Sequence, residues 1–131
     1  FLPPDQIGVV VLAALGRAVA RVPRFQAEWT RTEWFDDRVL WLAPEPAESF
    51  GDLTAAVFEE FPDYPPFGGQ YDRVVPHLTV GNGAPLADLK AAERLIEPLL
   101  PFSMPVAHVQ VLAGSPTIGS WRMLAELPLG P

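Results

Sequence analysis

The spacing of apolar residues changes several times along the chain, and each change predicts a new element. Near the start, apolar positions recur every three or four residues, which predicts a helix that opens after Pro3-Pro4-Asp5 and stops at Pro23. From Phe25 to Phe35 the period becomes two, as in a strand, and Asp36-Asp37 is a turn signal. The continuously apolar run Arg38–Ala43 then closes a predicted hairpin, with its second strand buried on both faces.

The rest of the chain is predicted to add two helices and three strands. In chain order these are a helix from Ser49 to Pro62, a strand through Val75–Val80, a turn at Gly81-Asn82-Gly83, a helix opening at Pro85, and strands at Phe102–Leu112 and Ser120–Leu129. The order helix, hairpin, helix, strand, helix, hairpin predicts an α+β fold with a mainly antiparallel sheet. No linker or low-complexity segment divides residues 1–131, so we expect a single domain.

The composition excludes several classes of function. The chain has 131 residues and no cysteine, which excludes disulfides, thiolate catalysis and thiolate metal sites and makes the cytoplasm the default location. The net charge of −7 leaves no broad basic face for a long nucleic-acid duplex. A nucleotide or the end of an RNA strand needs only a local pocket and remains a possible partner.

The apolar run Ile7–Leu15 is neither a signal peptide nor a membrane span by its pattern. No basic residue precedes it, Asp5 lies in front of it, and it is too short to cross a bilayer. No membrane association is therefore expected. Because the chain begins at Phe1 without a methionine, we expect it to be the trimmed part of a longer protein.

The candidate chemistry lies in the segment Val75-Pro76-His77-Leu78-Thr79-Val80. In a strand, successive side chains alternate between faces, so His77 and Thr79 should share one face while Leu78 and Val80 pack on the other. Imidazole moves protons near neutral pH, and a hydroxyl can donate to an anionic oxygen. The pair suits proton transfer on a phosphate ester without a metal or another cofactor. A His-x-Thr tripeptide also occurs by chance, and a structural histidine is the alternative.

Other residues give weaker signals. Phe67 and Tyr71, in a loop rich in glycine and proline, would stack on a base or plug the edge of a core. Arg73 and Arg122 would contact phosphate or be surface charges. His108 is followed by Gln110 and does not repeat the motif, and two distant histidines without cysteine give no case for zinc. The tryptophans are expected in the core and in sheet packing, namely Trp29, Trp34, Trp41 and Trp121.

The segment order resembles that of the 2H phosphoesterase superfamily, and specifically its bacterial branch of 2′-5′ RNA ligase family proteins. The most specific likeness is Asp72–Val80, and the segments Arg38–Pro44 and Ser120-Trp121-Arg122 are also similar. The resemblance implies a LigT-like fold of two lobes, with antiparallel sheets, flanking helices and one His-x-Thr motif in each lobe. It implies a metal-independent phosphodiesterase or 2′-5′ RNA ligase-like enzyme in which one histidine is the base, the other is the acid, and both threonines hold the phosphate. The implied substrates are 2′,3′-cyclic or 2′-linked phosphodiesters of nucleotides or RNA.

The chain departs from this pattern in two respects. It carries one His-x-Thr motif, and Phe1-Leu2-Pro3-Pro4 resembles the exit from the first motif, so we expect that motif and its strands upstream of Phe1. With half of the acid-base pair, the 131 residues alone should be nearly inactive on such esters. Gly81-Asn82 stands where many relatives place a cation that helps to bind phosphate.

Three hypotheses follow from the sequence. The first is a 2H-type cyclic phosphodiesterase in which His77 and Thr79 are catalytic and Tyr71, Arg73 and Phe67 bind the substrate. The second is a nucleotide-binding or RNA-end-binding module without turnover. The third is a domain without a ligand that forms a homodimer through an exposed sheet edge.

Overall fold

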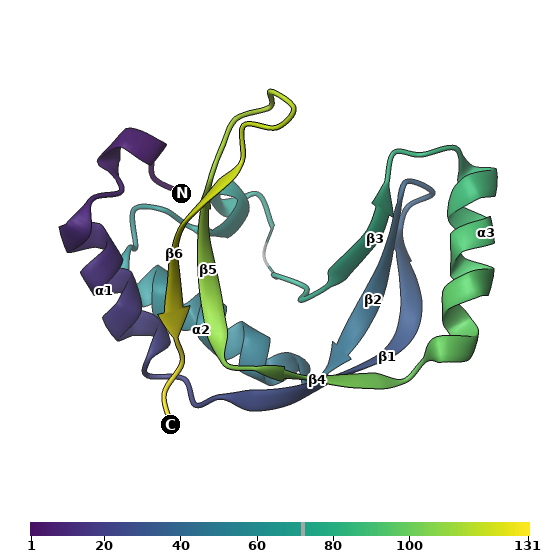
Figure 1. Ribbon diagram of the computed structural model, residues 1–131, viewed down its shortest axis with the longest axis horizontal. Coiled ribbons are helices and arrows are strands. Elements are labelled where there is room, and N and C mark those ends of the chain that lie inside the picture. The colour runs from purple at the N-terminus through teal and green to yellow at the C-terminus, as the bar shows by residue number, and fades with distance from the viewer. Residues whose placement is uncertain (72) are drawn as a thin grey trace. The chain divides into compact units, whose positions relative to one another are not determined.

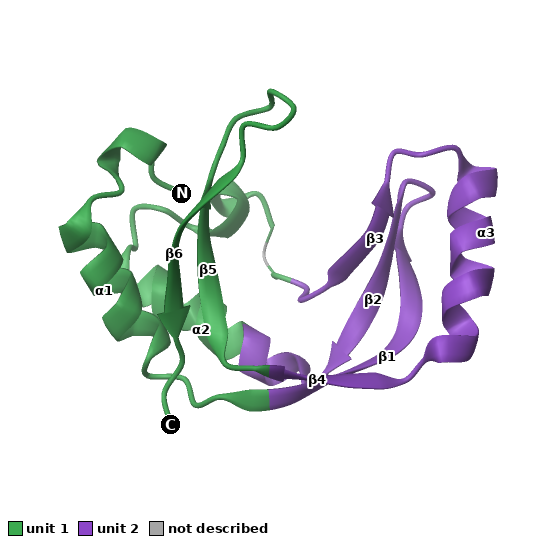
Figure 2. Cartoon of the chain, viewed as in Figure 1, with its two compact units in different colours: residues 1–25, 51–74, 106–131 green, residues 26–50, 75–105 purple. Residues whose placement is uncertain are grey.

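The computed structural model describes residues 1–71 and 73–131, which form two compact units (Figure 2). Unit 1 contains residues 1–25, 51–74 and 106–131, and unit 2 contains residues 26–50 and 75–105. Asp72, the first residue of the segment that resembles the 2H phosphoesterases, lies outside the described residues. The chain crosses from unit 1 into unit 2 between Val74 and Val75, just before His77.

Unit 2 is built on a four-stranded sheet. Its strands are β1 (Phe25–Phe35), β2 (Val39–Glu45), β3 (Leu78–Asn82) and β4 (Phe102–Val106), in the spatial order β3-β2-β1-β4 (Figure 1). β2 pairs antiparallel with both β1 and β3, which confirms the predicted hairpin. Its central position explains why every residue from Leu40 to Pro44 is buried, as the continuous apolar run predicted.

Helix α3 (Leu86–Ile96), followed by the 3₁₀ turn Glu97–Leu99, packs on one face of this sheet. Its buried residue Leu89 lies against Gly81 of β3, and Glu93 accepts hydrogen bonds from two side chains of β1. These donors, Thr32 and Trp34, alternate with the residues of the opposite face. Consequently α3 covers one side of the sheet, and the other side is available for chemistry.

Unit 1 contains α1 (Val9–Val19), most of α2 (Ala47–Glu60), and the antiparallel pair β5 (His108–Ala113) and β6 (Arg122–Pro128). Short 3₁₀ turns lie at Pro4–Gln6 and Pro66–Gly69. α1 packs on β6, where Gly16 leaves room for Leu127. The Arg21 guanidinium donates to the Ala56 carbonyl oxygen at 2.8 Å and so joins the end of α1 to α2.

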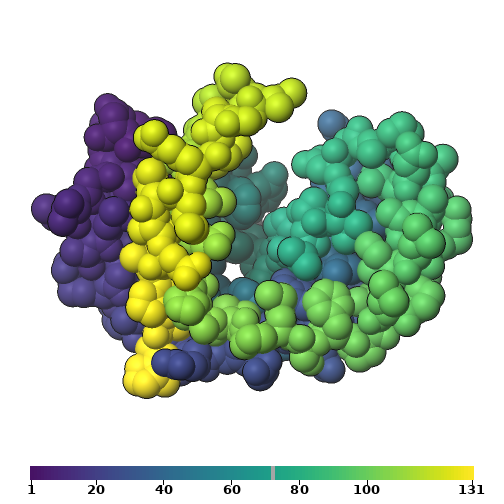
Figure 3. Space-filling view, viewed as in Figure 1, coloured from purple at the N-terminus to yellow at the C-terminus, as the bar shows by residue number. Residues whose placement is uncertain are grey.

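The β5–β6 sheet has one packed face and one exposed face. Val109, Val111 and Ala113 are half-buried or buried, whereas His108, Gln110 and Leu112 are exposed, as are their cross-strand partners Met123, Glu126 and Pro128. The segment between the two strands projects from unit 1 (Figure 3), and Ile118 within it is fully exposed.

Several predicted boundaries are wrong, for physical reasons. α1 begins at Val9 and not near Asp5, because residues 4–6 form a separate 3₁₀ turn and Gly8 is the N-cap. The predicted strand Phe102–Leu112 is two strands in different sheets, and Ala107 between them accepts a hydrogen bond from Leu129. A period of two continues across such a change of sheet, so the pattern alone does not reveal it.

The region around β3 also differs from the prediction. Gly81 and Asn82 belong to β3 and pair with β2, so the turn starts only at Gly83. Leu78 is 41% exposed because β3 is an edge strand, although it lies on the face opposite Thr79 as expected. Trp29 and Trp41 are core residues, but Trp121 is 63% exposed and is not.

Within the described part of the chain, none of the helices combines the length and apolar character that a membrane span requires.

Candidate catalytic site on the sheet of unit 2

His77 and Thr79 lie on the sheet face of unit 2 that α3 does not cover. Thr79 is paired directly opposite Trp41 of β2, and Trp41 is paired opposite Glu33 of β1. Residues that oppose each other in antiparallel strands project from the same face, so these three side chains share one face, together with Phe35, two residues beyond Glu33. His77 stands directly before β3, two residues before Thr79, and its ring contacts the same aromatic residues.

The His77 ring is held by a backbone hydrogen bond and by two aromatic rings. Its Nδ1 lies 2.7 Å from the Val75 carbonyl oxygen. Its ring centroid lies 5.1 Å from that of Phe35 and 5.9 Å from that of Trp41, both in edge-to-face geometry. Phe35 and Trp41 stack on each other at 4.7 Å. Each such aromatic pair stabilises its geometry by about 0.5–1.5 kcal/mol, so the ring orientation is well defined.

The bond to Val75 determines which nitrogen of the neutral His77 ring has the free lone pair. A carbonyl oxygen only accepts, so Nδ1 must carry the hydrogen that it donates. In the neutral ring, Nε2 then has the free lone pair. His77 is exposed, so Nε2 is free to accept a proton from an incoming group. A backbone carbonyl that fixes the tautomer in this way is a common means of orienting a histidine for proton transfer.

Thr79 adds a hydrogen-bond donor beside this base. Its side chain is exposed, and its hydroxyl has no hydrogen-bond partner within residues 1–71 and 73–131. A threonine hydroxyl rotates freely and can donate to a non-bridging phosphate oxygen. The structure therefore brings the two predicted catalytic residues together on one face, with complementary roles.

The aromatic neighbours of His77 were not identified as site residues from the sequence. Trp41 is only 7% exposed, and its Nε1 has no partner among the described residues. A buried unpaired N–H typically lowers the free energy of unfolding by about 1–3 kcal/mol, so the burial of this indole N–H is unfavourable by itself. The alternating pattern of the hairpin could have indicated that Phe35 on β1 and Trp41 on β2 share a sheet face. Only the pairing of the strands shows that this face is the one beside His77.

Gly81 shows why no cation follows the motif on this strand. The register shifts between Leu40 and Trp41, which leaves Val80 in a bulge and puts Gly81 opposite Leu40. A Cβ at position 81 would lie 2.5 Å from Leu89 of α3. A side chain at position 81 would thus point at α3 and away from the Thr79 face.

The predicted substrate-binding residues belong to unit 1. Phe67 and Tyr71 are 57% and 64% exposed, and their rings meet edge to face at 5.7 Å. They do not plug a core edge, which was the alternative to a binding role. Arg73 is exposed. Phe67 has a φ of 51° and two glycines with positive φ follow it, so the loop has a tightly turned backbone.

The remaining candidates lie on the β5–β6 sheet of unit 1. His108 is on the exposed face of β5, and Arg122 is exposed on β6. Over residues 1–71 and 73–131, the structure places no three histidine, aspartate or glutamate side chains where together they could hold a metal ion.

Fold and site define a class: an α+β protein with antiparallel sheets that presents a His-x-Thr pair at an edge strand. The family model of the 2′-5′ RNA ligase superfamily matches residues 1–115, and the chain belongs to this superfamily. The resemblance found in the sequence is thus confirmed.

Among solved structures, the chain is similar to the crystal structure of TT0787 from Thermus thermophilus. The TM-score is 0.64 at 17% sequence identity, over 98% of this chain and 72% of that one. At this identity the likeness establishes the fold, and the LigT-like α+β architecture is confirmed. A comparison with curated protein sequences gave no match.

Proposed function

We propose that this chain carries the His77–Thr79 half of a metal-independent phosphodiesterase site. The substrates in this proposal are 2′,3′-cyclic or 2′-linked phosphodiesters of nucleotides or RNA ends. One observation carries the proposal: the Val75 carbonyl oxygen holds Nδ1 of His77, so that Nε2 is left as the base beside the Thr79 hydroxyl, which has no hydrogen-bond partner among the described residues. Membership in the 2′-5′ RNA ligase superfamily supports a nucleotide or RNA substrate.

For a 2′,3′-cyclic phosphate, the chemistry requires one proton removed and one delivered. Nε2 of His77 accepts a proton from the attacking water, whose oxygen bonds to phosphorus, and the P–O bond to the ribose breaks. The leaving oxygen takes a proton from a second acid. If His77 instead acts as the acid, its protonated ring donates the proton that the leaving oxygen takes up. Thr79 donates to the non-bridging oxygen on which negative charge gathers in the transition state.

The second acid-base group is assigned by resemblance to a first His-x-Thr motif upstream of Phe1. The loop aromatics Phe67 and Tyr71, exposed on unit 1, are proposed to stack on a base, and Arg73 to contact a phosphate. The cytoplasm, where nucleotides and RNA ends are abundant, is the proposed location.

The test is hydrolysis of a 2′,3′-cyclic nucleotide in excess EDTA, with the chain joined to whatever residues its gene encodes upstream of Phe1. His77→Ala should lower kcat by about 10²–10⁴-fold, the usual contribution of a general acid or base. Thr79→Val should lower it by roughly 10²-fold, as for loss of one donor to a transition-state oxyanion. Both residues are exposed, so neither change should alter the fold.

His108→Ala is the matched control, since it removes an equally exposed histidine from unit 1. Turnover that survives chelation, collapses in His77→Ala and persists in His108→Ala supports the proposal. Equal turnover in the parent protein and His77→Ala, or turnover abolished by EDTA, would contradict it.

A further inference from the structure

Arg31 is the basic residue on the same sheet face as the candidate site. The sequences of β1, β2 and β3 contain no other lysine or arginine. Arg31 is paired opposite Ala43, and Ala43 follows Trp41 by two residues on β2. Because side chains two apart in a strand share a face, Arg31 projects from the face that carries Trp41 and Thr79.

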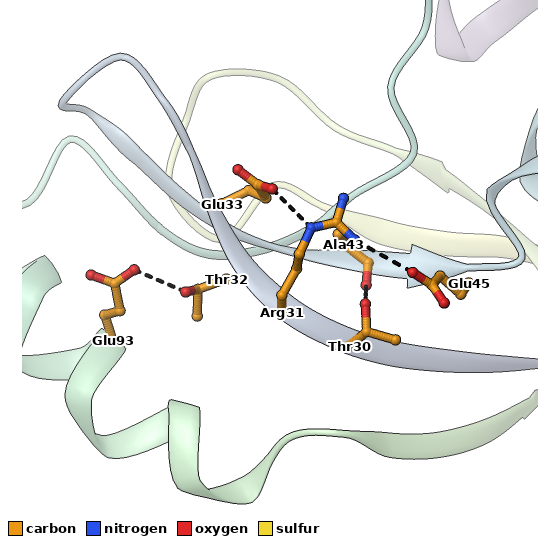
Figure 4. Close-up of polar contacts among 7 residues, drawn as sticks. All are labelled: Thr30, Arg31, Thr32, Glu33, Ala43, Glu45 and Glu93. Carbon is orange, nitrogen blue, oxygen red and sulfur yellow. Dashed lines mark hydrogen bonds and ion pairs between the residues drawn. The ribbon is translucent and has the colours of Figure 1, made fainter.

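Two carboxylates hold the guanidinium of Arg31 in place (Figure 4). Its Nε donates to Oε1 of Glu33 at 2.9 Å, and its Nη1 lies 3.5 Å from Oε1 of Glu45. Nη2 has no hydrogen-bond partner within the described residues. The side chain is 56% exposed, and ion pairs at such exposure are weak and readily exchanged for another anion. Arg31 is therefore oriented but still available.

The register places Arg31 and Thr79 on one face, two strands apart. Thr79 is opposite Trp41, Trp41 is opposite Glu33, and Arg31 precedes Glu33 by two residues in β1. Two strand spacings, about 10 Å, separate the backbones of β1 and β3. Because the Arg31 Nε donates to Glu33, the guanidinium is turned toward the row that contains Thr79. This arrangement lets the long arginine side chain approach a phosphate held by Thr79.

An open pocket begins at Arg31 and continues away from Thr79. Its volume is about 620 Å³, and it is lined by Glu28, Arg31, Pro44, Glu45, Pro46, Ala47 and Glu48, all residues of unit 2. It does not include His77 or Thr79. The pocket leaves the solvent side of the guanidinium accessible, and it gives room to the part of a substrate that extends beyond its phosphate.

We propose that Arg31 is the phosphate-binding cation of this site. Glu33 and Glu45 orient the guanidinium in the free protein, and the phosphate replaces them as its partner. An arginine can bind two phosphate oxygens in parallel, which fixes the phosphate as well as attracting it. This inference rests on the proposed function and adds a residue that determines how tightly its substrate binds. The competing interpretation is a solvated ion-pair network with no ligand.

The test compares charge-matched variants in two assays, cyclic-nucleotide hydrolysis and binding of adenosine 2′-monophosphate, a product of such hydrolysis. Arg31→Gln should raise KM and Kd about 10-fold or more, with a smaller change in kcat, and Arg31→Lys should recover part of the loss. Glu33→Gln should lower Kd a few-fold, because it removes a carboxylate that competes with the phosphate. In the Arg31→Gln background the same change should tighten binding less, which separates competition for Arg31 from a general change in charge.

Arg38→Gln, an equal charge change at the exposed β1–β2 turn, is the control and should leave Kd unchanged. If the parent protein binds the nucleotide and Arg31→Gln matches Arg38→Gln, the Arg31 assignment is wrong while the His77 site stands. If the parent protein neither binds nor hydrolyses, both proposals fail.

Discussion

Glu93 joins α3 to the four-stranded sheet of unit 2 through a single carboxylate oxygen. Removing this side chain tests how much the contact between α3 and the sheet contributes to stability. Oε1 of Glu93 accepts from Oγ1 of Thr32 and from Nε1 of Trp34, both at 2.9 Å. All three side chains are half-buried. Figure 4 shows the bond between Thr32 and Glu93. The two donors lie on the face opposite Thr79, so the variant Glu93→Ala perturbs the support of the site without touching its chemistry.

The expected cost follows from the two bonds. Hydrogen bonds to a charged acceptor are each worth about 1.5–3 kcal/mol when fully formed, and here partial exposure lets water replace some of that. We assign about 1 kcal/mol to each, so Glu93→Ala should lower the free energy of unfolding by about 2 kcal/mol. Glu93→Gln keeps an acceptor oxygen without its charge and should lose about 1 kcal/mol.

Urea denaturation followed by tryptophan fluorescence measures both changes, and a thermal melt should shift by roughly 3–5 °C per kcal/mol for a chain of this length. Glu97→Ala is the control, because Glu97 is exposed in the next turn, and its effect should stay within about 0.5 kcal/mol. Glu93→Ala and Glu97→Ala with equal stabilities would refute the role of Glu93. A loss in Glu93→Gln as large as that in Glu93→Ala would show that charge, not the acceptor oxygen, carries the contact.

Two further predictions concern the same sheet and use the same denaturation assay. Leu40 is fully buried in β2, so Leu40→Ala should cost about 2–5 kcal/mol, whereas Leu95→Ala, at a residue 75% exposed on α3, should cost less than about 0.5 kcal/mol; similar losses would contradict the assignment of the core. Gly81→Ala would place a methyl group against Leu89, and this overpacking should cost about 1–3 kcal/mol. An unchanged midpoint in Gly81→Ala would show that β3 moves away from α3 at no cost.

The hydrophobic pattern determined the elements of this protein well where a single periodicity applied. β1 covers Phe25–Phe35 as predicted, and the buried run of β2 was visible as an unbroken apolar stretch. Both are local properties, because a strand with one buried face alternates and a central strand does not. The motif His77-x-Thr79 and the resemblance of the chain to its superfamily were likewise visible in the residue order.

What the pattern could not supply was pairing. Nothing local distinguishes Phe102–Val106 from His108–Ala113, yet these strands belong to different sheets. Trp121 is a large apolar residue of the kind found in cores, but it lies exposed directly before β6. Burial depends on what covers a residue, and that is decided by contacts between segments far apart in the chain.

The candidate site divides in the same way. The sequence by itself determined that an imidazole and a hydroxyl two residues apart in an extended segment would share a face. Only the tertiary structure decided that the bond to Val75 leaves the lone pair of the neutral His77 ring on Nε2, and that Phe35 and Trp41 hold the ring. It also placed Arg31 on the face of Trp41 and Thr79, because the cross-strand register, set by the pairing of three strands and their bulges, is a property of the folded sheet and not of any one segment.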